Sequence, residues 1–195
     1  MKKIVCFTTI FLISIVLSGC GGKKSVTKIQ DKDLANEYAN APQWVLGAAM
    51  DQGMAAVGSA KKSKAGMQHT RSMALASARD EMARMMNVKV KNMVKNFTET
   101  TGIGDDETVD KVSTNVSKQI SSQLLSGSRQ KDIWISPSGE VYVLITLDSE
   151  LAAQAVKNSI MSSYKNEKTL WQKFQANKAQ EELEEEIEKE FGSTK

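Results

Sequence analysis

The chain has 195 residues, of which 41% are hydrophobic and 25% charged, and its formal net charge is +3. This length is sufficient for one domain with a substantial core plus extensions. The small charge excess gives no general electrostatic affinity for nucleic acid, so a nucleic-acid partner is not expected.

The first segment is typical of an export signal. Two lysines follow Met1, and residues 4–16 form an uncharged apolar run that is too short for a membrane-spanning helix. The run closes on Leu17-Ser18-Gly19-Cys20, which resembles a bacterial lipobox. The resemblance implies that residues 1–19 are removed and that Cys20 is acylated. The alternative is an uncleaved N-terminal helix with an incidental cysteine.

Removal of the signal changes the composition of the mature chain. Lys2 and Lys3 leave, so the net charge falls from +3 to +1, and loss of Cys6 makes Cys20 the sole mature cysteine. A disulfide is then impossible once Cys20 carries lipid. Gly21 follows that cysteine where an aspartate would favour retention at the inner membrane, so we expect an outer-membrane anchor.

Residues 20–41 are polar and are expected to form a flexible tether, with a helical turn within residues 33–40. The folded domain is expected to begin at Pro42, with Trp44 as an anchor in the core or at its rim. Gly53 to Ala60 consists of small residues and predicts a strand that another element approaches closely.

Residues 68–86 predict a helix, because Ala74, Ala78 and Met82 recur at helical spacing. Residues 87–101 fit either a strand or a continued helix, and the alternation of Val88 and Val90 favours a strand. Residues 105–127 predict a second helix that ends at Gly127. Its apolar positions are Val109, Val112, Val116, Ile120 and Leu124.

A β-hairpin is expected next. Residues 132–136 form its first strand, Pro137-Ser138-Gly139 its turn, and residues 141–147 a nearly continuous apolar strand that belongs in the centre of a sheet. The predicted fold is therefore α+β: an antiparallel sheet of three to four strands, with helices mainly on one face and a C-terminal helical extension.

Residues beyond 149 read as helical through Phe191, in two pieces that meet near Asn166. Residues 151–180 hold five lysines against one acid, whereas residues 181–195 hold seven glutamates against two lysines. Leu183, Ile187 and Phe191 give the tail a narrow apolar stripe. Either the stripe packs on a partner, or the tail is a solvated helix that frays.

No catalytic motif is apparent. The single histidine, His69, is expected to be a solvated or capping residue, and the loop of Asp105, Asp106, Glu107 and Asp110 lacks the pattern of a calcium-binding loop. The chain is therefore not expected to be an enzyme or to hold a metal or cofactor, apart from the covalent lipid at Cys20.

The methionines of residues 50–93 and a cluster of lysines each have both a structural and a functional interpretation. Methionines concentrate between residues 50 and 93, which favours core packing over an adaptable binding surface. Lys61, Lys62 and Lys64 form a basic cluster that could reach anionic head groups or another subunit, although a solvated loop is the simpler interpretation.

Several segments together resemble a known family. They are Trp44, residues 56–60, residues 78–84, residues 132–136 and residues 141–144. In this order, behind a lipobox, they resemble the Lpp-twenty family of twenty-kilodalton membrane-associated lipoproteins, which includes a lipoprotein of the disk around some flagellar motors. The resemblance implies a scaffold and not a catalyst.

The expected organisation is a signal peptide (1–19), a lipidated tether (20–41), a family-like α+β domain (42–150) and a charged helical extension (151–195). We expect an outer-membrane lipoprotein that faces the periplasm and associates with itself, within a flagellar disk or beside other envelope proteins. The alternative is an envelope module that binds peptidoglycan, lipid or an outer-membrane protein. Exposure at the cell surface is the alternative orientation.

Overall fold

The computed structural model describes residues 32–47, 54–176 and 179–192. Three strands form one antiparallel sheet in the order β1-β3-β2, where β1 is Met54–Ala60, β2 is Arg129–Ile135 and β3 is Val141–Leu147. Ala60 pairs with Val141, which in turn pairs with Ile135, and a register shift separates Gln130 from Asp132. The sheet therefore confirms the α+β prediction, including the central position of the apolar second hairpin strand.

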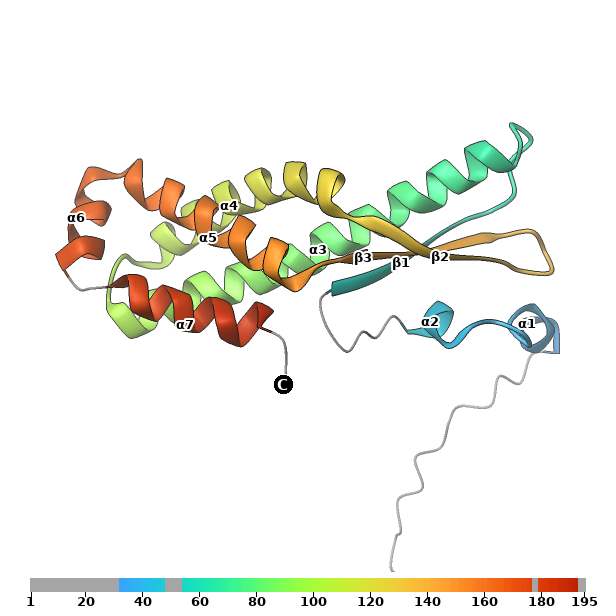
Figure 1. Cartoon of the computed structure of the whole chain (residues 1–195), viewed down its shortest axis with the longest axis horizontal. Coiled ribbons are helices and arrows are strands. Elements are labelled where there is room, and N and C mark those ends of the chain that lie inside the picture. Colours follow the sequence, from blue (N-terminus) through green and yellow to red (C-terminus); the bar gives the residue numbers. More distant parts are fainter. Residues whose placement is uncertain (1–31, 48–53, 177–178, 193–195) are drawn as a thin grey trace, which may run out of the picture.

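One long helix, α3 (Met67–Thr101), joins the sheet to the helical part of the molecule (Figure 1). Its first half packs on β1 and β3, and its second half packs on α4 (Asp106–Gly127) and α7 (Ala179–Phe191). Two further helices, α5 (Ser149–Lys165) and α6 (Lys168–Ala176), complete the bundle. Two short helices, α1 (Lys32–Glu37) and α2 (Gln43–Leu46), precede the sheet.

The small residues of β1 permit a very close approach of α3. A Cβ atom on Gly58 would lie 2.0 Å from the backbone nitrogen of Ala78 and 2.5 Å from the carbonyl oxygen of Ala74. Both alanines have no exposed surface. The prediction of a small-residue strand against a small-residue helix face is therefore confirmed.

The expectation of a strand at residues 87–101 is wrong, because α3 continues without a break to Thr101. Val88 is 61% exposed, whereas Val90, Val94 and Phe97 are buried at helical spacing. The buried face that includes Met82 therefore continues along the same side of the helix through Phe97. Packing of this face outweighs the preference of the two valines for a strand. The helix ends where Gly102 adopts a left-handed conformation, with φ of 66°.

The second predicted helix is confirmed as α4. Val109, Val112, Val116 and Ile120 are buried, whereas the side chain of Leu124 lies outside the described part of the chain. The helix ends at Gly127, as expected.

The C-terminal helices share the core of the family-like domain. Phe97 of α3 packs against Tyr164 of α5 and Phe174 of α6, with ring centroids 5.8 and 6.0 Å apart. Leu183 and Phe191 of α7 are buried in the same core. The boundary between α5 and α6 lies near Asn166, as predicted, but the helical region has three pieces and not two.

The apolar stripe of the tail thus finds its partner within the chain, on α3 and α5. Lys89 of α3 fixes the last turn: its ammonium donates to the carbonyl oxygen of Glu190 at 2.7 Å and lies over the ring of Phe191. Lys157 of α5 donates to Glu184 at 2.6 Å. Lys157, one of the lysines that precede the acidic tail in the sequence, and Lys89 of α3 therefore form contacts that hold α7 on the rest of the bundle.

Candidate functional site

The face of the sheet opposite α3 carries a cluster of aromatic side chains. Tyr142 of β3 and Trp134 of β2 lie with ring centroids 5.4 Å apart, and Tyr38, which follows α1, packs on both. The hydroxyl groups of Tyr38 and Tyr142 are 2.8 Å apart and form a hydrogen bond. Burial raises the pKa of Tyr142, so its hydroxyl stays protonated at neutral pH. The cluster holds the N-terminal segment on the sheet.

Two polar contacts reinforce this docking. The indole Nε1 of Trp44 donates to Oδ2 of Asp132 at 2.9 Å. The carboxylate of Glu37 accepts hydrogen bonds from the backbone N–H and the hydroxyl of Ser138, at 3.2 and 2.6 Å. Hydrogen bonds from Ser136 and Ser138 lower the pKa of Glu37. Trp44 is half-buried, which agrees with an anchor at the rim.

Part of the predicted tether is folded. The predicted tether of residues 20–41 includes residues 32–41, yet α1 and Tyr38 contact the hairpin. The helical turn expected within residues 33–40 is present as the main part of α1. Cys20, the predicted lipidation site, lies outside the described residues.

The β1–α3 loop lies at the same end of the molecule (Figure 1). Lys61, Lys62 and Lys64 are exposed. A Cβ atom on Gly139 would lie 3.2 Å from Cδ of Lys62, so the stem of Lys62 packs on the hairpin turn. The hairpin turn thereby connects the lysines to α1, from which the tether leads.

The outer edge of β2 is a second surface of interest. The sheet order leaves β2 with β3 as its single strand partner among the described residues. Ile133 and Ile135 pair with the core residues Val143 and Val141 and so face the α3 side of the sheet. They are nevertheless 38% and 47% exposed, because α3 packs over β1 and β3.

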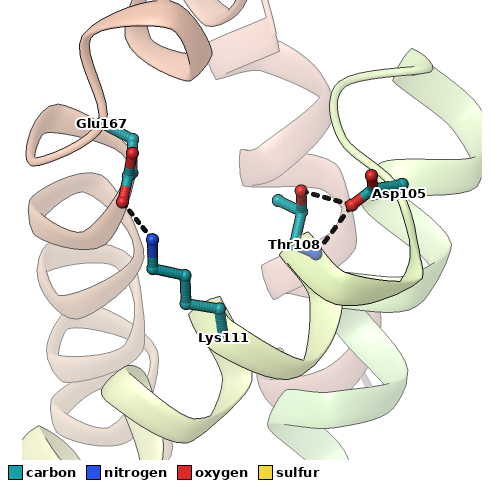
Figure 2. A network of polar contacts seen from close by, with 4 residues as sticks. All are labelled: Asp105, Thr108, Lys111 and Glu167. Carbon is teal, nitrogen blue, oxygen red and sulfur yellow. Dashed lines mark hydrogen bonds and ion pairs between the residues drawn. The ribbon is translucent and has the colours of Figure 1, made fainter.

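At the far end of the bundle, a polar network lines a recess of about 250 Å³ (Figure 2). Oδ1 of Asp105 accepts hydrogen bonds from the backbone N–H and the hydroxyl of Thr108, at 2.9 and 2.8 Å, and these bonds lower its pKa. Lys111 donates to Glu167 of the α5–α6 turn, and this hydrogen bond raises the pKa of Lys111. The charges of this network serve to cap α4 and to join it to the α5–α6 turn.

Asp105 of the acidic loop thus caps α4. Asp110 pairs with Lys91 at 3.0 Å instead of joining Asp105. Within residues 32–47, 54–176 and 179–192, no group of three or more His, Cys, Asp or Glu side chains is arranged to hold a metal ion.

The other candidate residues serve packing or lie in solvent. His69 is exposed in the first turn of α3. Among the methionines, Met54, Met82, Met86 and Met93 are buried. Met67, Met73 and Met85 are partly exposed on α3. Within residues 54–93, core packing therefore accounts for four methionines and leaves three at the surface.

The sequence profile of the LPP20 lipoprotein family matches residues 42–148. The match covers more than half of the chain and includes the sheet, α3 and α4. The chain belongs to the LPP20 lipoprotein family. This membership confirms the resemblance derived from the sequence and indicates a membrane-associated lipoprotein.

No curated protein matches the chain significantly. None of the helices in the described ranges has the length and apolarity needed to cross a bilayer. The surface features of this LPP20 protein are the N-terminal segment docked on the sheet, the lysines of the β1–α3 loop and the edge of β2.

Proposed function

We propose that this LPP20 lipoprotein is a structural scaffold of the bacterial envelope. Acyl chains on Cys20 anchor it in the outer membrane, and its folded domain lies in the periplasm and associates with other copies. The observation that supports association is the exposed apolar edge of β2. The outer membrane is supported by the glycine at position 21, where an aspartate would favour retention at the inner membrane.

An edge strand presents backbone N–H and C=O groups that can pair with another chain. Soluble proteins usually protect such strands with charges or bulges. The first four residues of β2 are protected, because Arg129, Lys131 and Asp132 are exposed charges, the register shifts, and Oδ1 of Asp132 accepts the backbone N–H of Ile133 at 2.8 Å. The remaining residues expose the side chains of Ile133 and Ile135 and offer apolar burial, with strand pairing beyond Ile133, to a second copy.

Anchoring would strengthen a weak contact of this kind. Copies held at one membrane share a thin layer, so their effective concentration exceeds the concentration that they would have in free solution. The docking of α1 on the sheet supports the same idea, because it keeps the domain near the lipid. A flagellar disk is one assembly that such a scaffold could build, and this part of the proposal rests on the family resemblance alone.

Replacement of Cys20 with serine should abolish the lipid anchor. Cells fed a fatty acid that carries an alkyne should label the wild-type protein and leave Cys20→Ser unlabelled. The wild type should fractionate with the outer membrane. Labelling of the serine variant, or wild-type protein that stays in the soluble fraction, would contradict the proposed anchor.

The double substitution Ile133→Glu and Ile135→Glu should weaken self-association by about tenfold, which corresponds to ~1.4 kcal/mol. The reason is that two charges would oppose burial of the β2 edge. Sedimentation velocity of the mature chain with Cys20→Ser, over a range of concentrations, measures this difference. Val88→Glu is the control for a charge at an exposed apolar position away from the β2 edge, because Val88 is an exposed residue on α3. A wild-type chain that sediments as a monomer at every concentration would count against association in solution.

A further inference from the structure

The stem of Lys62 packs on the hairpin turn, but the charged ends of the lysines in the β1–α3 loop have no partner among the described residues. We define the lysine loop as residues 61–64, with Lys61, Lys62 and Lys64 as its charged members. All three side chains are exposed, and none makes an ion pair or a side-chain hydrogen bond to another residue that the structure describes. The loop itself is held in place, because the backbone N–H of Ser63 donates to Oγ1 of Thr70 at 3.0 Å. The three positive charges therefore stand on a fixed backbone.

The lysine loop lies where the tether enters the domain. Glu37, the last residue of α1, contacts Ser138 of the hairpin turn, and the stem of Lys62 packs on Gly139 of the same turn. Lys32 lies twelve positions after Cys20 in the chain. A chain segment of that length spans at most ~40 Å. Acylation of Cys20 would thus keep this end of the domain close to the head groups.

At the opposite end of the molecule, the surface of α7 is acidic. Glu181, Glu184, Glu185 and Glu188 are exposed on α7, which lies at the other end of α3 from the lysine loop (Figure 1). An anionic surface attracts the loop and repels α7. Both forces favour one orientation of the domain, with the lysine loop toward the lipid.

From these observations we propose that the lysine loop is a docking surface for anionic phospholipid head groups and orients the domain on its membrane. This inference rests on the proposed anchor at Cys20. A contact between the loop and α7 of a neighbouring copy is the competing arrangement. Copies tethered through the same end have the same orientation on the membrane. The α7 helix of a neighbouring copy is then farther from the membrane than the lysine loop and cannot reach that loop.

The test uses the mature chain with Cys20→Ser, so that binding does not depend on acylation. The protein is mixed with vesicles of phosphatidylcholine, with or without phosphatidylglycerol, and the bound fraction is measured by co-sedimentation at low salt. Each lysine near an anionic surface contributes about fivefold to binding, so neutralising all three to glutamine should reduce binding to the anionic vesicles by about a hundredfold. High salt should remove the same preference.

A matched control removes three lysines elsewhere. Lys118 of α4 and Lys168 and Lys173 of α6 are also exposed, and their change to glutamine alters the net charge equally. This control should retain most of the binding. Equal losses in the two triple variants would overturn the proposal, because net charge alone would then explain binding. Undiminished binding of the loop variant would also overturn it, and if the same variant self-associated less, the loop would be a contact between copies.

Discussion

Gly58→Ala should lower the free energy of unfolding by about 3 kcal/mol, near the upper end of the usual cost of overpacking a core. The added methyl carbon would lie 2.0 Å from the backbone nitrogen of Ala78 and 2.6 Å from its Cα. Neither atom can move without displacing α3, on which β1 and β3 pack. Urea denaturation followed by circular dichroism measures the change.

Gly47→Ala is the control for this substitution. A Cβ atom on Gly47 would meet nothing within 4 Å, so its effect should stay within about 0.5 kcal/mol. If Gly58→Ala proved as mild as Gly47→Ala, the close contact between β1 and α3 would be refuted.

Leu183→Ala should destabilise the chain by about 3 kcal/mol, within the range found for buried leucines. Leu183 is 1% exposed and lies in the core that α7 shares with α3 and α5. Truncation would leave a cavity between these helices, because the surrounding residues can collapse only in part. Thermal and urea denaturation measure the loss, and limited proteolysis shows whether α7 detaches first.

Glu185→Ala is the matched control on the same helix, since Glu185 is exposed. It should change stability by less than about 0.5 kcal/mol. A similarly small effect of Leu183→Ala would mean that the tail does not pack on the bundle and is instead the solvated helix that the sequence also allowed.

The sequence predicted those elements whose signals are local. The apolar spacing from Val109 to Ile120 indicated α4, and the turn of Pro137 and Gly139 between two apolar runs indicated the hairpin. Gly58 and the alanines of α3 together indicated a close packing contact. In each case the pattern itself contains the physical cause of the structure.

Prediction from the sequence failed where contacts between residues far apart in the chain determine the structure. Val88 and Val90 suggested a strand, but helical packing against α4 and α7 keeps that region in α3. Docking of the N-terminal segment depends on Tyr38 and Tyr142, which are 104 residues apart in the chain. The exposed edge of β2 depends equally on where α3 packs. No short pattern contains either arrangement.

We propose that anchoring through Cys20 concentrates copies that then associate through the edge of β2. This association is tested by coupling the mature chain through its sole thiol to a maleimide lipid in vesicles and treating it with an amine-reactive cross-linker. Cys20→Ser at the same bulk concentration is the untethered control, and the tethered variant with Ile133→Glu and Ile135→Glu tests the edge. We expect dimers and larger species for the tethered wild type, and mainly monomers for the other two. A tethered wild type that stays monomeric at every surface density would contradict it.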